Sequence, residues 1–134
     1  METYSIFFSY QSDIPQNKSM FMDIKKKLQK RFSKQNIDLK VKVGTYNTSG
    51  NPPILSEMLE LAKTSDIFIA DLTYIATQTL AHKAKHIPNP NVLLELGHAW
   101  NFFDTHHIIF IQNSRYGDGS LLPVDLKEFR WPIT

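Results

Sequence analysis

Short apolar strands alternate with amphipathic helices along this chain, and this alternation restricts its fold more than any other feature. One apolar strand lies between Asp66 and Asp71, with no polar residue between these two acids. A continuous apolar run of this kind is typical of a central strand that is covered on both faces. Strands that are joined through helices favour a parallel sheet with right-handed crossovers. We therefore expect an α/β fold with this strand near its centre.

Hydrophobic periodicity predicts the other elements. The expected strands are 4–9, 37–43, 66–71, 107–111 and 129–133. The expected helices are one from Asn17 or Ser19 to about Lys34, one over 53–63 and one from Pro90. Residues 37–43 alternate between apolar and polar, which indicates an edge strand. Residues 72–88 are expected to be a connection with at most a short helix. The first and third of these strands have the sequences most typical of central strands. This favours a flavodoxin-like, five-stranded parallel sheet of order 2-1-3-4-5.

The composition limits the function classes. The 134 residues suffice for one domain, 1–134, and the absence of cysteine excludes disulfides and thiolate metal sites. The net charge of +2 does not favour nucleic acid as a partner, and the basic run 25–31 is interpreted as a solvated helix face. No apolar run is long enough for a membrane helix, and no signal peptide is recognised. We expect a cytoplasmic protein.

Glu95 is the strongest candidate for chemistry. Asn89 and Pro90 are typical of a helix N-cap and its first residue, and the helix that follows is apolar around Glu95. Burying a carboxylate costs several kcal/mol unless it is paired or neutral. A positioned carboxylate can act as a base, a nucleophile or a stabiliser of an oxocarbenium ion. The structural alternative is an ion pair with Arg115 or Arg130.

The same helix offers neighbours for such a site. At helical spacing, Asn91 and His98 share a stripe with Glu95. Gly97 in a helix interior costs about 1 kcal/mol relative to Ala, which predicts close packing or the approach of a ligand.

Ligands in open α/β sheets bind beyond the carboxyl ends of the strands, at the point where the strand order reverses. This rule gathers polar residues that follow the first three strands: Ser9, Tyr10, Gln11, the loop 44–51, Asp71 and Thr73. Capping or a turn is the alternative role for Asp71, and an exposed loop is the alternative for 44–51. His82 and His86 would suit a metal only if they were helical, and no third ligand is placed by spacing, so we expect no metal site.

The chain resembles the bacterial TIR-like, predicted nucleotide-binding domains. The resemblance rests on five pieces in order along the chain: 6–13, 50–54, 65–73, 88–99 and 122–126. It implies cleavage of the bond between nicotinamide and ribose in NAD, with hydrolysis or cyclisation as the outcome, and a role in antiphage defence. It implies no cofactor, since NAD is the substrate. It also implies Glu95 as the catalytic residue and Phe8 and Ser9 as lining of the nicotinamide–ribose pocket.

The resemblance further implies homo-oligomers through TIR–TIR contacts and, in many relatives, a second sensor domain, so this chain could be an excised domain. The long connection 74–87 departs from the family pattern. The piece Glu95–Ala99 is also similar to nucleoside 2-deoxyribosyltransferases, which use a helix-borne Glu on an N-glycosidic bond. The alternatives to an NAD glycohydrolase are therefore a deoxyribosyltransferase-like enzyme and a non-catalytic nucleotide-sensing or assembly module.

Overall fold

The computed structural model describes residues 1–11, 13–43, 52–117 and 122. Its helices and strands in chain order are β1 (Glu2–Ser9), α1 (Pro15–Ser33), β2 (Ile37–Val43), α2 (Pro52–Lys63), β3 (Ile67–Asp71), β4 (Tyr74–Leu80), β5 (Lys83–Pro88), α3 (Pro90–Ala99) and β6 (Ile108–Ile111). Two short 3-10 turns, Thr105–His107 and Ser114–Tyr116, flank β6.

The main sheet is parallel, and the described strands follow the order β2-β1-β3-β6. The α/β class and the central positions of β1 and β3 are confirmed, as is the edge position of β2. The four described strands match the first four places of the expected order 2-1-3-4-5. The expected fifth strand, 129–133, lies outside the described residues.

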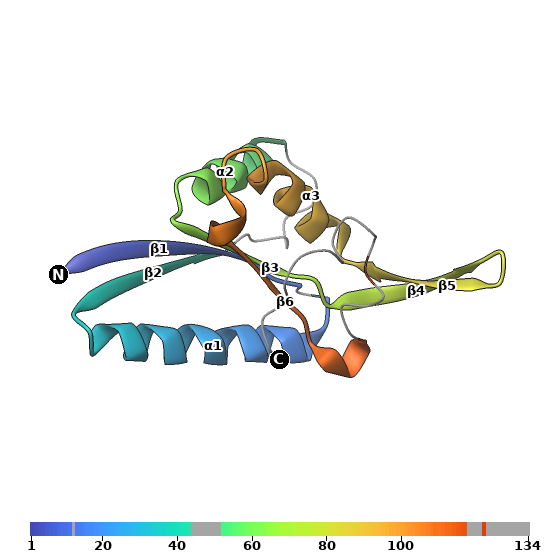
Figure 1. Cartoon of the computed structure of the whole chain (residues 1–134), viewed down its shortest axis with the longest axis horizontal. Coiled ribbons are helices and arrows are strands. Elements are labelled where there is room, and N and C mark those ends of the chain that lie inside the picture. Colours follow the sequence, from blue (N-terminus) through green and yellow to red (C-terminus); the bar gives the residue numbers. More distant parts are fainter. Residues whose placement is uncertain (12, 44–51, 118–121, 123–134) are drawn as a thin grey trace.

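Helices cover both faces of this sheet, with α1 on one side and α2 and α3 on the other (Figure 1). The alternation of side chains along β1 explains the division. Ile6 and Phe8 pack with Phe21 of α1, whereas Phe7 packs on the opposite side with Ala62 of α2. Because both faces of β1 are buried at its carboxyl half, its sequence is apolar without alternation.

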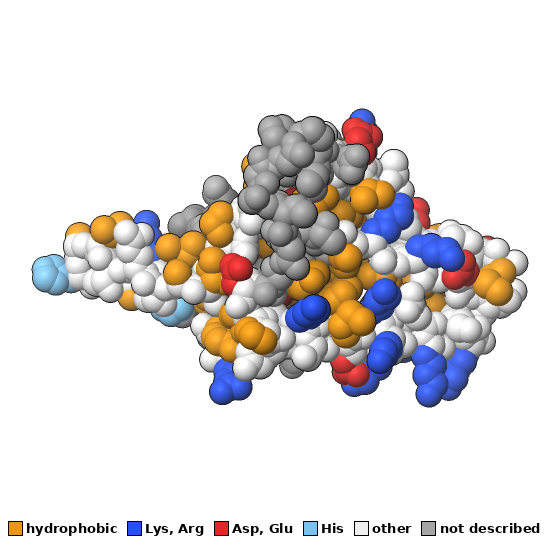
Figure 2. Space-filling view, turned by 180° about the vertical axis from the view of Figure 1, so that it is seen from behind, with side chains coloured by type: hydrophobic (Ala, Val, Ile, Leu, Met, Phe, Trp, Pro, Cys, Tyr) orange, Lys and Arg blue, Asp and Glu red, His pale blue; other side chains and the backbone are white. Residues whose placement is uncertain are grey.

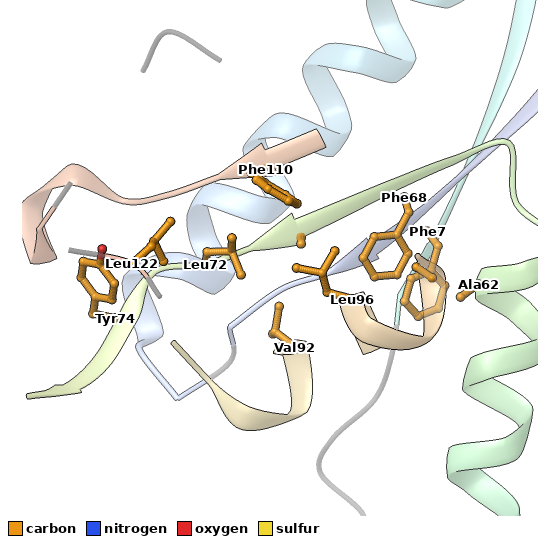
Figure 3. Packing of buried hydrophobic residues seen from close by; sticks show 11 residues of the cluster. Phe7, Ala62, Phe68, Leu72, Tyr74, Val92, Leu96, Phe110 and Leu122 are labelled. Atoms are coloured by element: carbon orange, nitrogen blue, oxygen red, sulfur yellow. The ribbon is translucent and has the colours of Figure 1, made fainter. Parts of the chain in front are cut away.

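The core beneath α2 and α3 is built around aromatic rings. Phe7 and Phe68 stack with their ring centroids 5.6 Å apart. Val92 and Leu96 of α3 point onto the same cluster, which Phe110 of β6 closes on its other side (Figure 3). The packing of this helix face fixes which side of α3 is turned toward the sheet.

The connection 72–88 is an antiparallel hairpin, so the expectation of a loop with at most a short helix was wrong. Strands β4 and β5 pair with each other and extend away from the main sheet (Figure 1). Ala81 and His82 form the two-residue turn with φ of 49° and 63°. Hairpin turns of this kind usually carry Asn-Gly. Neither residue signals such a turn, and the largely exposed strands show no one-sided apolar pattern.

The basic residues of α1 lie on its solvent side, which confirms the interpretation of the run 25–31 as a solvated face. Lys26, Lys27, Lys30 and Arg31 are exposed, and Figure 2 shows Lys and Arg side chains along the lower edge, where α1 lies. In the described part of the chain, no helix combines the length and apolarity needed to cross a bilayer.

Candidate active site

Asp71, the last residue of β3, is fully buried and joins the carboxyl ends of two strands. Its Oδ2 accepts hydrogen bonds from the Gln11 backbone N–H at 3.0 Å and from Asn17 Nδ2 at 2.9 Å. Its Oδ1 accepts from the Thr73 backbone N–H at 3.1 Å and from Thr73 Oγ1 at 2.6 Å. A carboxylate offers about four acceptor positions. The protein supplies a donor for each, so we interpret Asp71 as a residue that positions its neighbours.

The network continues to the segment after β6. The backbone N–H of Asn113 donates to Thr73 Oγ1 at 2.9 Å, and Asn113 Nδ2 donates to Asn17 Oδ1 at 3.1 Å. Gln112 Nε2 donates to the Leu72 carbonyl at 2.9 Å. These bonds hold the ends of β3 and β6 and the first turn of α1 in one arrangement.

A second group of hydrogen bonds fixes the start of α3 against the loop after β1. Asn89 is the N-cap of α3, as expected, and its Oδ1 accepts from the Asn91 backbone N–H at 2.8 Å. Asn89 Nδ2 donates to Asp13 Oδ2 at 2.9 Å and lies 3.4 Å from Gln11 Oε1. The backbone N–H of Asp13 also donates to Gln11 Oε1, at 2.6 Å. Gln11 therefore contacts both groups.

Glu95 occupies a position in the buried stripe of α3. The buried residues of this helix are Val92, Glu95, Leu96 and Ala99, and Glu95 is 1% exposed. At 1.5 Å per residue, Glu95 lies about 9 Å along the helix axis from Asn89. The prediction that this carboxylate lies in the apolar run is confirmed. The helix that carries it starts at the carboxyl end of the sheet, where ligands of α/β folds bind.

The predicted site residues next to the carboxyl end of β1 pack beneath α1 or are buried in the strand. Phe8 is 2% exposed and packs edge-to-face on Phe21, with ring centroids 4.8 Å apart. Tyr10 stacks on the same ring at 4.7 Å. In this conformation both are core residues beneath α1, whereas the resemblance implied that Phe8 lines a pocket. Ser9 is fully buried on the strand between them, and Thr73 belongs to the Asp71 network.

Two residues of α3 differ from the prediction. The predicted stripe of Asn91, Glu95 and His98 is not uniform, because Asn91 is exposed while Glu95 is buried. Gly97 is exposed, and a Cβ built on it would meet no atom of the described residues within 4 Å. Close packing as the reason for this glycine was therefore wrong, and the alternative, the approach of a ligand, stays a prediction.

Asn17 and Asn113 belong to the polar cluster but were not predicted as site residues. The helix was expected to begin at Asn17 or Ser19, whereas α1 begins at Pro15, and the Asn17 side chain donates a hydrogen bond to Asp71. Asn113 follows the strand that ends at Ile111. The rule for carboxyl ends of strands would have found Asn113 if it had been applied to the fourth strand as well as to the first three.

Other candidates lie elsewhere. His82 is in the hairpin turn and His86 is on β5, so helical spacing does not relate them. Within the described ranges, no group of three potential metal ligands was found. Arg115 is exposed in the turn after β6. The loop 44–51 and Arg130 lie outside the described residues.

A cavity of about 550 Å³ lies against α2 and the turn after it, with Ser56, Glu60, Leu61 and Thr64 in its lining. Thr64 is three residues before β3 begins, so this cavity lies toward the amino end of that strand. It is at the opposite edge of the sheet from Asp71. We place the candidate site with the polar cluster, because that cluster lies at the carboxyl ends of the strands, where α/β folds bind ligands.

Comparisons with known proteins support the fold. No family model matches the chain, and no curated protein matches its sequence. Among solved structures, a 2-desoxiribosyltransferase from Leishmania mexicana shares the fold with a TM-score of 0.56 and 19% sequence identity. The match covers 81% of this chain and 64% of that chain, so this chain spans less than two thirds of the enzyme's length. The likeness supports an α/β sheet fold, and it does not extend to the TIR-like assignment.

Proposed function

We propose that this domain breaks the N-glycosidic bond of a nucleoside, as a deoxyribosyltransferase-like enzyme with Glu95 as its catalytic carboxylate. The observation that carries the proposal is the position of Glu95, which is 1% exposed on the buried stripe of α3. Two findings support the choice of bond. The short segment Glu95–Ala99 is similar to a segment of deoxyribosyltransferases, and the fold of most of the chain is similar to that of the Leishmania mexicana enzyme.

The proposed chemistry needs one carboxylate and a leaving base. Glu95 attacks the anomeric carbon of the sugar, the bond from that carbon to the base nitrogen breaks, and its electron pair leaves with the base, which takes up a proton from solvent. A second base then attacks the same carbon through a ring nitrogen, loses the proton of that nitrogen to solvent and releases the Glu95 carboxylate, so the sugar is transferred with overall retention. A carboxylate in an apolar setting also stabilises the cationic sugar of the transition state more strongly than it would in water.

The test is base exchange. Purified protein is incubated with a 2′-deoxynucleoside and a different free base, and the products are separated by chromatography. The expected result is a new deoxynucleoside, with free base and sugar when no acceptor base is added. Glu95→Gln keeps the shape of the side chain and should lower the rate by about 10²-fold or more.

Glu60→Gln is the matched control, because Glu60 is an exposed helical glutamate on α2. Its activity should equal that of the wild-type protein. Exchange that persists in Glu95→Gln at more than about a tenth of the wild-type rate would contradict the assignment of Glu95.

NAD glycohydrolase activity is the second candidate, supported by the five pieces that resemble TIR-like domains. It acts on the same class of bond and would use the same carboxylate. Release of nicotinamide from NAD in a parallel reaction distinguishes it from base exchange. TIR-type self-association, a sensor partner and a role in antiphage defence remain predictions that belong to this candidate. Binding without turnover of either substrate would instead support a non-catalytic sensing module.

A further inference from the structure

Gln11 is a buried glutamine whose side-chain amide uses its oxygen, but not its nitrogen, in hydrogen bonds within the described structure. It is fully buried, and its Nε2 has no hydrogen-bond partner in the described structure. Buried polar side-chain atoms in folded proteins nearly always have a partner, so an exception requires an explanation. A group whose partner arrives with a bound ligand is one such explanation.

The orientation of the Gln11 amide follows from its neighbours. Oε1 accepts a hydrogen bond from the Asp13 backbone N–H at 2.6 Å, and Asn89 Nδ2 lies 3.4 Å from it. If the amide were reversed, its NH₂ group would face these two donors. The network therefore assigns the oxygen to the side with these two donors and the NH₂ group to the side without a described partner.

Hydrogen bonds to β3 and to the start of α3 fix the position of Gln11. Its backbone N–H is bound to Asp71 at the end of β3, and its side chain contacts Asn89 at the start of α3. The residue follows β1, at the edge of the sheet where α/β folds bind ligands. A donor held in this way costs little conformational entropy when a ligand binds.

The charges nearby indicate what the donor would meet. The Asp13 carboxylate lies 2.9 Å from the same Asn89 amide, and the Asp71 carboxylate lies 3.0 Å from the Gln11 backbone nitrogen. Two carboxylates, one bound to the Gln11 backbone and one bound to its neighbour Asn89, disfavour an anionic group such as phosphate in this region. An uncharged oxygen fits better.

We propose that Gln11 Nε2 is a substrate-recognition donor that binds an uncharged oxygen of a nucleoside, either a sugar hydroxyl or a carbonyl of the base. This inference rests on the proposed function, because it assumes that a nucleoside occupies the site. It makes Gln11 a specificity residue that takes no part in the bond breaking assigned to Glu95.

The test measures binding with ligands that lack one candidate acceptor each. Calorimetry compares 2′-deoxyinosine with 2′,3′-dideoxyinosine and 2′,5′-dideoxyinosine, which each lack one sugar hydroxyl, and with 2′-deoxyadenosine, in which an amino group replaces the base carbonyl. The wild-type protein should bind 2′-deoxyinosine roughly tenfold more tightly than one of the three analogues, and that analogue identifies the acceptor. Equal binding of all four ligands would overturn the proposal without any variant.

Gln11→Glu is the informative variant, because a carboxylate can still accept from Asp13 and Asn89 but cannot donate. It should bind 2′-deoxyinosine and the identified analogue equally. Gln11→Met serves if the glutamate variant does not fold, and the same loss of discrimination is expected. Gln112→Glu is the matched control: Gln112 is a buried glutamine whose Nε2 already donates to Leu72. It should lower stability and keep the discrimination between ligands.

The outcomes separate the two proposals. Base exchange with discrimination that survives in both Gln11 variants overturns the role of Gln11 and leaves the proposed function intact. Gln11-dependent discrimination in binding without any turnover overturns the proposed function and leaves the recognition role intact. Tighter, Gln11-dependent binding of inorganic phosphate than of the nucleoside would overturn the assignment of an uncharged acceptor.

Discussion

The side-chain amide of Asn17, in the first turn of α1, donates a 2.9 Å hydrogen bond to Asp71 Oδ2 at the end of β3. This bond joins a helix to a strand 54 residues further along the chain. The side-chain oxygen of Asn17 accepts a hydrogen bond from Asn113 Nδ2, so this asparagine connects the end of β3 with the segment after β6. The polar cluster therefore supports the sheet edge that we assign to the site.

Asp71→Asn should destabilise the protein by roughly 2–5 kcal/mol. Asn has only one acceptor atom, so at least one pair of donors among Gln11, Asn17 and Thr73 would face an NH₂ group. Chemical denaturation measures the change. Asp66→Asn is the control, since Asp66 also accepts from a backbone N–H, that of Ser5, but is exposed. A loss for Asp71→Asn no greater than the control's would contradict the role of Asp71 as an organiser.

Gly97→Ala should stabilise α3 by about 0.5–1 kcal/mol, because alanine is the better helix former and its Cβ would meet no described atom within 4 Å. Gly117→Ala is the opposite case. Gly117 has φ of 126°, and a Cβ there would lie 2.9 Å from the Tyr74 ring, so this variant should lose stability. Melting temperatures compare the two. Reduced base exchange in a stabilised Gly97→Ala protein would indicate that a ligand approaches this face of α3.

Trp100→Ala should cost roughly 3 kcal/mol of stability and reduce activity through unfolding. Trp100 is partly buried against the core and packs edge-to-face on Phe110, with ring centroids 6.3 Å apart. Leu94→Ala on the same helix is the control, because Leu94 is 55% exposed and should change little. Thermal melts with and without nucleoside decide the matter. A variant that melts at the normal temperature but no longer binds the nucleoside would show that Trp100 belongs to the binding site.

The hydrogen bond with His107 lowers the pKa of Asp104, and the backbone N–H of His106 adds to the effect. A carboxylate whose pKa is lowered on folding contributes stability above its unfolded pKa, which is lost as the pH falls through the folded value. An NMR titration of Asp104 should therefore give a midpoint below the ordinary aspartate value. His107→Ala should raise that midpoint. A midpoint unchanged by this substitution would show that His107 has no influence on Asp104.

Local sequence patterns determined much of the fold. The apolar run before Asp71 predicted a central strand, and the alternation in 37–43 predicted an edge strand. Both predictions were possible because a strand covered on two faces is apolar throughout, whereas a strand with one exposed face alternates between apolar and polar residues. Asn89 and Pro90 marked the start of α3, since capping is a local interaction. The burial of Glu95 followed from its place among apolar residues at helical spacing.

Tertiary structure decided the rest. The β4–β5 hairpin extends from the main sheet and has no one-sided apolar face, so periodicity carried no signal for it. The position of Asn17 beside Asp71 depends on how α1 packs across the sheet, and the orientation of Gln11 depends on Asn89, which is 78 residues away in the chain. Hydrogen bonds between such distant residues leave no periodic trace in a sequence, because only the packing of the sheet and its helices brings them together.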